Sequence, residues 1–307
     1  MKRGSSGLSL VVGVDKPLQM SSHDVVGKAR GIFNERRVGH TGTLDPLATG
    51  VLVLCIGSAT RLSPHLQALD KSYRFRMAFG ASTDTDDAAG TVVQTGVPPA
   101  KAYDPVFAQA FVSHLVGKYQ QRPPAYSAIK VDGQRAYKAA RAGEELDLAP
   151  REVEVFSARL AGIDGESPAQ PVWDIEVAVS KGTYIRALAR DIGEALGCPS
   201  HVVALARTRL GVLALESCVS LAQLEQEKEK AALDPVALLG YPVVEVDGRE
   251  RADAANGKPL AGTGVCSSDG EEVSVVSGGR LIGLYCYDAR ARLLMPSCVF
   301  PKGVSRG

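Results

Sequence analysis

Gly39-His40-Thr41-Gly42-Thr43-Leu44-Asp45-Pro46-Leu47-Ala48-Thr49-Gly50 decides how the rest of this chain is interpreted, and an apolar run at 51–56 follows it directly. The three glycines permit backbone conformations closed to other residues, which predicts a tight, non-repetitive loop. Pro46 disfavours the helical region for Asp45, so we expect Asp45 in an extended or turn conformation. Such a loop can present one carboxylate and one imidazole to a cleft. The residue types alone favour an ordinary Asp-Pro turn before a buried strand.

Length and composition set the class of protein around this loop. A chain of 307 residues can form one large domain and a small one. It is 45% hydrophobic and 22% charged, which is typical of a soluble globular protein. The net charge of +1 means that a nucleic-acid surface would have to be a local basic patch. The short apolar stretch 8–14 makes a poor signal peptide and nothing approaches a membrane span, so we expect a cytoplasmic protein.

The six cysteines form no C-x-x-C pair. Cys198 and His201 are close in sequence, but no second pair accompanies them to complete a zinc site. The segment 83–90 resembles a calcium loop superficially, yet it lacks the alternate ligand spacing, the glycine at the sixth position and the terminal glutamate. The sequence therefore predicts reduced thiols and no metal.

Hydrophobic periodicity predicts an α+β fold. Tyr73, Phe75, Met77 and Phe79 alternate with polar or small residues, which is the period of a half-buried strand. Capping side chains at 21–24 precede a predicted helix at 25–33. From residue 240 on, short strands separated by turns predict a small β-barrel of about 65 residues. The other predicted strands are 8–14, 152–160, 172–179, 242–246, 272–276, 281–287 and 293–299, and the other predicted helices are 63–69 and 105–116.

Two further segments carry candidate functional residues. If Thr183 is the N-cap of the helix that follows it, Arg186 stands in the first turn, where a cation opposes the helix dipole at a cost of about 0.3–1 kcal/mol. Such a choice often marks function, and a structural ion pair explains it equally well. The segment 121–138 combines prolines, aromatics and cations, which suits either a loop that grips a nucleic-acid strand or a surface β-hairpin. A helix with a basic side is predicted at 134–142.

The order of residues adds a resemblance to the pseudouridine synthases of the TruB type, which act on tRNA. Residues 39–52 fulfil every fixed position of that family's pattern G-H-x-G-x-L-D-P-x-A-x-G-x-L. The pattern D-K-P-x-G-x-[ST]-S-x-D is met at 15–24 except that Gln19 replaces the glycine, which leaves the geometry of this turn open. The resemblance covers roughly residues 12–211. The remaining matches are K-x-Y at 71–73, T-D-T-x-D-x-x-G at 83–90, P-P-x-Y-S-A-x-K-x-x-G-x-x-x-Y at 123–137, G-T-Y-I-R-x-L-x-x-D at 182–191 and L-x-R-T-x-x-G at 205–211.

The resemblance implies a role for particular residues. Asp45 is expected to be the catalytic aspartate, Arg186 its ion-pair partner and Tyr73 a catalytic-site tyrosine. From the residues alone, Tyr73 is better explained as a core tyrosine and Leu205 as a core leucine, whereas Lys16 fits a structural role as well as an active-site one. The expected substrate-binding residues are His40, Tyr184, Leu205, Lys16 and Lys130.

The resemblance also implies a fold and a reaction. The expected fold is a mixed, mainly antiparallel sheet flanked by helices in a catalytic domain at 1–238, with an RNA-clamping insertion around 121–150 and a PUA-like RNA-binding barrel at 239–307. The expected reaction converts uridine 55 of the TψC loop of tRNA to pseudouridine on a flipped-out base, without cofactor, in a monomer that needs no protein partner and no membrane. Two alternatives stay open: an RNA-binding or RNA-folding protein without catalysis, and a synthase acting on another RNA.

Overall fold

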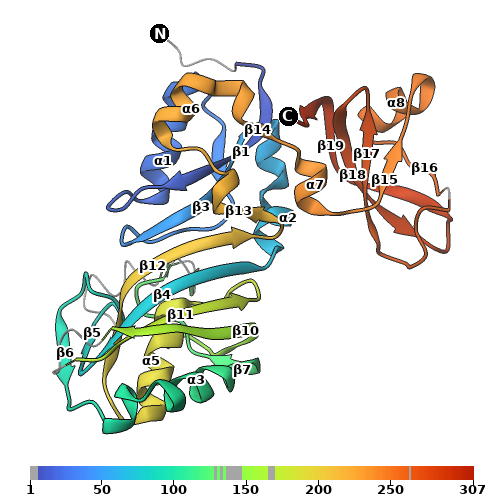
Figure 1. The fold of residues 1–307 in the computed structure, drawn as a ribbon. Helices are drawn as coiled ribbons and strands as arrows, with labels where there is room; N and C mark the ends of the chain where they lie inside the picture. Colours follow the sequence, from blue (N-terminus) through green and yellow to red (C-terminus); the bar gives the residue numbers. More distant parts are fainter. Residues whose placement is uncertain (1–5, 128–129, 132–133, 136–146, 165–169, 263) are drawn as a thin grey trace. The chain divides into compact units, whose positions relative to one another are not determined.

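The computed structural model describes residues 6–127, 130–131, 134–135, 147–164, 170–262 and 264–307. It divides the chain into two compact units, one formed by residues 1–69 and 209–307 and the other by residues 70–208. Both units combine strands with helices, so the predicted α+β class is confirmed (Figure 1).

The first unit is built on two long apolar strands. Strand β1 (Ser9–Lys16) pairs antiparallel with β3 (Ala48–Gly57) along its whole length, from Ser9 opposite Gly57 to Lys16 opposite Gly50. Between them the chain forms α1 (Ser22–Ile32) and β2 (Val38–His40), which pairs with the outer side of β3. Ser21 caps α1 in a capping box with Asp24, as the sequence predicts. The loop that contains Asp45 thus connects two neighbouring strands of one sheet.

The rest of the first unit consists of short elements and a C-terminal sheet. The five strands of that sheet have the order β15-β17-β18-β19-β16, and only the β15–β17 pair is parallel within it. Helix α8 (Gly248–Ala255) packs beside β18 and β19 and was not predicted from the sequence. The elements of this part are η1 (Ser58–Leu62), α2 (Ser63–Ala68), β13 (Leu213–Ala214), η3 (Leu215–Ser217), α6 (Leu221–Glu227), η4 (Lys228–Ala231), β14 (Ala232–Leu233), α7 (Pro235–Leu239), β15 (Val243–Glu245), β16 (Leu260–Ala261), β17 (Glu272–Ser277), β18 (Arg280–Asp288) and β19 (Leu293–Ser305).

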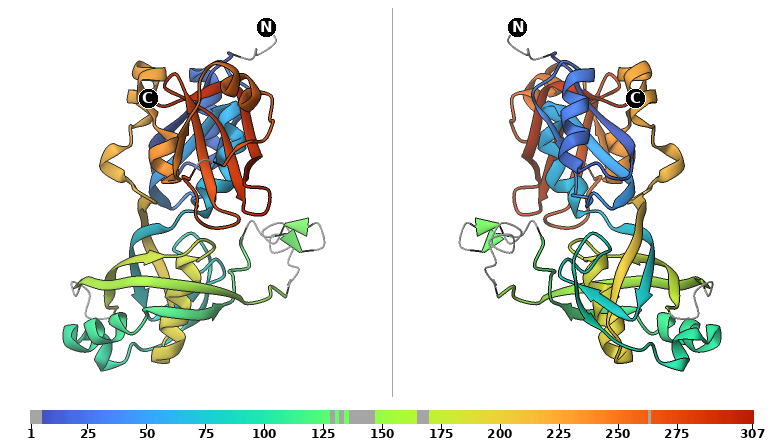
Figure 2. Two further views of the ribbon diagram at one scale, coloured as in Figure 1. Left: turned by 90° about the vertical axis from the view of Figure 1, so that its right-hand side faces the viewer. Right: turned by 90° about the vertical axis from the view of Figure 1, so that its left-hand side faces the viewer.

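A shared core holds the N-terminal strands and the C-terminal sheet together. Val11 of β1 and Val53 of β3 belong to the same buried cluster as Leu284 of β18 and Phe300 of β19. Both views of Figure 2 accordingly draw the blue N-terminal strands against the red C-terminal strands. Burying apolar area of this kind is the main stabilising contribution in folding. The loop with Asp45 therefore extends from a well-packed framework.

The second unit contains the sheet β12-β4-β11-β10-β7. Strand β4 shows the predicted alternation, with the side chains of Tyr73, Phe75, Met77 and Phe79 buried. Helices α3 and α5 lie together along this sheet, where Phe111 of α3 meets Trp173 of β11 edge-on (Figure 1). The elements are β4 (Lys71–Phe79), β5 (Ala81–Thr83), β6 (Val92–Thr95), η2 (Ala100–Tyr103), α3 (Pro105–Ser113), β7 (Gly117–Gln121), β8 (Lys130–Val131), β9 (Gln134–Arg135), β10 (Arg151–Asp164), β11 (Val172–Val179), α5 (Ile185–Leu196) and β12 (Ser200–Leu210).

The described part of the predicted insertion differs from expectation at one point. Gln134 and Arg135 form strand β9, which pairs with β8, and so they do not begin a helix. Residues 136–146, where the remainder of the predicted basic helix falls, lie outside the described residues. Within the described ranges no helix is long and apolar enough to cross a membrane.

Candidate active site

The loop of Asp45 is held in place by the hydroxyl of Ser22. Ser22 lies at the first turn of α1 and is buried. Its Oγ donates to the carbonyl of Leu44 (3.0 Å) and accepts from the N–H of Leu44 (2.8 Å). The carbonyl of Asp45 accepts from the N–H of Ala48 (3.0 Å), which closes a turn over Pro46. The backbone on both sides of the partly exposed Asp45 is therefore fixed.

The turn at 16–20, between β1 and α1, also supports the loop of Asp45. Gln19 has φ 65°, the left-handed conformation that normally favours glycine, and its N–H donates to the carbonyl of Pro46 (2.8 Å). Gln19 thus retains the conformation that a glycine would adopt at this position of the motif. Lys16 is fully buried, and its ammonium donates to the carbonyls of Pro17 (2.9 Å) and Met20 (2.5 Å). Lys16 therefore holds the turn closed, and its predicted contact with substrate stays a prediction.

His40 ends strand β2 and is half-buried. Its Nδ1 accepts from the N–H of Gly42 (3.3 Å). An imidazole that accepts at Nδ1 and is neutral carries its proton at Nε2. His40 can thus offer a hydrogen-bond donor to a ligand without being charged.

Arg186 is a buried cation of the second unit, only 5% exposed. Its Nη1 donates to the carbonyl of Thr85 (2.7 Å) and its Nη2 to the carbonyl of Tyr126 (2.8 Å). Its Nε lies 3.7 Å from Oδ2 of Asp87. One guanidinium thus joins the loop between β5 and β6 to the segment after β7. Its position is set by groups far away in sequence.

Arg190 repeats this arrangement one helical turn later. Its Nη1 lies 3.1 Å from Oδ2 of Asp86, and its Nη2 donates to the carbonyl of Arg122 (2.7 Å). Burial raises the pKa of Asp86, and the neighbouring Arg190 and Arg186 oppose that shift. This pair was not predicted from the sequence. The i, i+4 spacing of two arginines, together with an acidic loop at 84–87, is the signal that could have found it.

Helix α5 begins one residue later than the sequence analysis assumed. Its N-cap is Tyr184, which has no side-chain capping bond, and Arg186 is the second helical residue. The hydroxyl of Thr183 donates instead to the carbonyl of Ser180 (2.9 Å), within the preceding turn. The ring of Tyr184 lies 5.8 Å from the guanidinium carbon of Arg151. The predicted N-cap at Thr183 is therefore wrong, whereas Arg186 does stand in the first turn.

Tyr73 and Leu205 are almost buried, at 9% and 8% exposure. Tyr73 lies opposite Val177 in the β4–β11 pair. Two residues earlier on the same strand, burial and then the nearby Arg207 lower the pKa of Lys71 to about 8.

The candidate residues are divided between the two units. Asp45, His40 and Lys16 belong to the first unit, and Tyr73, Tyr184, Arg186 and Leu205 to the second. Lys130 begins strand β8, and its side chain lies outside the described part of the chain. Among the described residues there is no group of three or more His, Cys, Asp or Glu side chains that could hold a metal ion.

Comparison with known proteins gives consistent results. A model of the TruB family pseudouridylate synthase N-terminal domain matches residues 30–185, and one of the tRNA pseudouridylate synthase B C-terminal domain matches residues 186–239. Proteins named tRNA pseudouridine synthase B from Mycobacteroides abscessus and Corynebacterium aurimucosum are each 44% identical over 275 residues, covering 89% of this chain and 91% of theirs. The one from Mycobacterium tuberculosis is 42% identical, with 89% and 90% covered.

Solved structures agree in fold. A Cbf5-Nop10-Gar1 complex matches with a TM-score of 0.68 at 25% identity, covering 98% of this chain and 86% of that one. An H/ACA RNP bound to a substrate RNA containing 2'-deoxyuridine matches with a TM-score of 0.69 at 23% identity, covering 97% and 87%. At these identities the likeness concerns the arrangement of the chain.

Proposed function

This chain belongs to the TruB family of pseudouridylate synthases, and on that basis we propose that it converts uridine 55 in the TψC loop of tRNA to pseudouridine. Relatives named tRNA pseudouridine synthase B match nine-tenths of the chain, which supports tRNA as the substrate. The observation that carries the proposal is the fixed backbone of the loop at 39–50. Ser22 holds Leu44 on one side of Asp45 and Gln19 holds Pro46 on the other, so the loop presents one carboxylate at a defined place.

Asp45 is the proposed catalytic residue. The enzyme must break the N1–C1′ glycosidic bond, rotate the uracil and join its C5 to C1′. Positive charge of the oxocarbenium type develops at C1′ as the first bond breaks, and an adjacent carboxylate is the suitable partner for that charge. The detached base must be retained and water excluded, so one carboxylate in a closed pocket is sufficient.

Arg186 is proposed to keep Asp45 ionised. Desolvation raises the pKa of a carboxylate, and a neighbouring guanidinium opposes the shift. The carbonyls of Thr85 and Tyr126 support this role, because they hold the guanidinium at a fixed place. Preorganised charge of this kind needs no rearrangement during the reaction.

The other candidate residues are proposed to bind the flipped uridine. A base must leave its stack before an enzyme can reach its glycosidic bond. Tyr73, which lies near the start of β4 and is 9% exposed, is assigned to contact the uracil and help remove the C5 proton. Tyr184 and Leu205 complete the pocket for the base, His40 occupies the space that the base vacates, and Lys130 contacts the RNA. Lys16, which is fully buried, serves substrate binding by holding the turn that supports the loop of Asp45.

The chain organisation follows from the same proposal. Residues 1–238 form the catalytic domain, with an RNA-clamping insertion around 121–150, and the sheet after residue 239 is a PUA-like RNA-binding barrel. The protein acts as a monomer in the cytoplasm without a protein partner. No cofactor takes part, because the rearrangement is redox-neutral and leaves the composition of the nucleotide unchanged: C5 loses a proton to solvent and N1 gains one.

The test uses unmodified tRNA labelled with tritium at C5 of uracil, since joining C5 to C1′ releases that hydrogen. The protein should release one equivalent of tritium from tRNA and none from a transcript with cytidine at position 55. A protein that binds tRNA without releasing tritium would be an RNA-binding protein only. Release from the cytidine-55 transcript would move the reaction to another uridine.

A further inference from the structure

Gln121, the last residue of β7, is completely buried and makes two hydrogen bonds with one distant residue. Its Oε1 accepts from the N–H of Tyr184 (2.8 Å), and its Nε2 donates to the carbonyl of Tyr184 (3.1 Å). The two residues are 63 positions apart in sequence. The carboxamide thus binds Tyr184 as a neighbouring β-strand would, through both backbone groups.

These bonds determine where helix α5 begins. Tyr184 is the N-cap, and its carbonyl also accepts the first helical bond, from the N–H of Leu188 (2.9 Å). The side chain of an N-cap residue usually accepts from a backbone N–H of the first helical turn, and that of Tyr184 makes no such bond. Gln121 instead accepts from the N–H of the N-cap itself, as the third helical residue does in a capping box, and the side chain of Arg186 leaves the helix two residues later.

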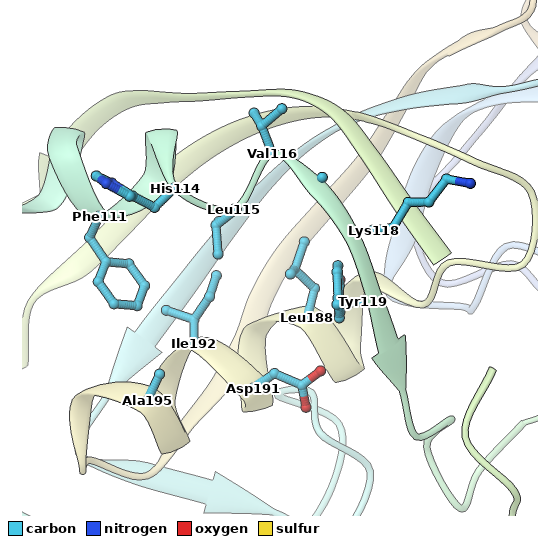
Figure 3. Close-up of a pocket in the computed structure, with 11 residues that line it drawn as sticks. Phe111, His114, Leu115, Val116, Lys118, Tyr119, Leu188, Asp191, Ile192 and Ala195 are labelled. Atoms are coloured by element: carbon cyan, nitrogen blue, oxygen red, sulfur yellow. The ribbon is translucent and has the colours of Figure 1, made fainter. Parts of the chain in front are cut away.

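Tyr119 fixes the orientation of the carboxamide. Nε2 of Gln121 lies 3.3 Å from the hydroxyl oxygen of Tyr119. Tyr119 lines a cavity of about 230 Å³ between β7, α3 and α5, and Figure 3 shows its ring near the carboxylate of Asp191. Burial, and then the nearby Asp191, raise the pKa of Tyr119 well above its usual value, so the phenol stays neutral. Because both acceptors face Nε2, the amide has one satisfactory orientation.

We infer that Gln121 is a positioning residue of the active site, which holds the backbone of Tyr184 and thereby sets the place of Arg186. This inference rests on the proposed function, in which Arg186 acts on the catalytic carboxylate. Gln121 does not touch the substrate. It acts on the rate of the chemical step through the first turn of α5, since a displacement of about 1 Å at a reacting group can cost about a hundredfold in rate.

The test compares Gln121→Met with Gln120→Met, because Gln120 is exposed on the same strand. Tritium release in a single turnover gives the rate constant, and filter binding gives the Kd for tRNA, both at a temperature where circular dichroism shows each variant folded. Gln121→Met should lower the rate constant roughly tenfold to a hundredfold and leave the Kd within about threefold. Gln120→Met should match the wild type in both.

A double-mutant cycle separates positioning from a general structural effect. In the Arg186→Lys background the rate loss caused by Gln121→Met should largely disappear, because the group that it positions is already altered. If Gln121→Met does not fold, Gln121→Asn replaces it, since its amide is one methylene too short to reach both groups of Tyr184. A folded variant with the wild-type rate constant, a loss confined to Kd, or an additive cycle would overturn the inference. A wild type that releases no tritium overturns the proposed function, and this inference with it.

Discussion

The N–H of Gln19 donates to the carbonyl of Pro46 over 2.8 Å, and Gln19 makes this bond from a left-handed backbone conformation with φ 65°. That conformation costs an L-residue about 1–2 kcal/mol, a strain that a glycine at this position would relieve. Glycine also loses more conformational entropy on folding, which offsets about 0.5–1 kcal/mol of the relief. Gln19→Gly should therefore raise the free energy of unfolding by up to about 1 kcal/mol and keep full activity. Urea denaturation and tritium release measure the two quantities.

Gln19→Val is the opposite variant. A β-branched side chain is strained at positive φ, so the stability should fall and the loop of Asp45 should lose its support from the turn at 16–20. Equal stability of the glycine and valine variants would show that the left-handed conformation at residue 19 carries no strain.

Ser21 and Ser22 are neighbours with different functions. Ser22 binds both backbone groups of Leu44, next to the proposed catalytic carboxylate of Asp45, whereas Ser21 caps helix α1. Ser22→Ala should lower the rate constant for tritium release about tenfold or more, because the loop is no longer fixed. Ser21→Ala should cost about 1 kcal/mol of stability and leave the rate constant unchanged. The same rate loss in both variants would mean that Ser22 acts only through the stability of α1.

Arg190 stabilises the second unit through Asp86. Removing one partner of a largely buried ion pair leaves the other charge without compensation, so Arg190→Met should cost about 2–3 kcal/mol in unfolding free energy. Adding Asp86→Asn should recover part of that loss, since the unpaired charge is then absent. Thermal and chemical denaturation of the two single variants and the double variant give the coupling energy. Additive losses would exclude an energetically important pair.

The ion pair between Arg306 and Asp234 predicts a pH dependence. Burial alone raises the pKa of Asp234, but hydrogen bonds from Arg306 and from the N–H of Val236 outweigh it and lower the pKa below its usual value of 3.8. A lowered folded-state pKa means stability that is complete above the unfolded-state value and lost as pH falls through the folded-state value.

Arg306→Met should therefore reduce stability by about 1 kcal/mol at pH 7. The difference from the wild type should shrink below about pH 4 as Asp234 becomes protonated in both proteins. Lys302→Met is the control, because that side chain is exposed on β19, the strand that Arg306 directly follows. A difference that persists unchanged at low pH would assign the loss to packing of the arginine side chain.

Local sequence patterns predicted the helices and strands that bury one face against the core. The alternation around Tyr73 gave strand β4, and the capping residues at 21–24 gave helix α1. Helix α8 was missed because only Ala254 of its eight residues is buried, so it has no apolar stripe to detect. The position of Arg186 could not be read locally either, since the carbonyls that hold it belong to Thr85 and Tyr126, 101 and 60 residues away.

The reaction itself was predictable only from the order of residues in several motifs. A single Asp-Pro turn has many explanations, and Gln121 stands outside the matched motifs because its role depends on one contact with Tyr184 across the fold. Long-range hydrogen bonds to backbone groups leave no periodic trace in a sequence. Residues that act through such bonds are therefore found from the contacts in the structure.

The central claim is that the carboxylate of Asp45 carries out the chemistry on tRNA. The most direct test is single-turnover tritium release from C5-labelled, unmodified tRNA by the wild type and by Asp45→Asn, with the Kd of each for the same tRNA measured alongside. Asparagine keeps the size and polarity of the side chain but cannot carry the negative charge that the glycosidic bond cleavage requires. We expect Asp45→Asn to bind tRNA with a Kd close to that of the wild type and to release no tritium. Release by Asp45→Asn at the wild-type rate would contradict the account.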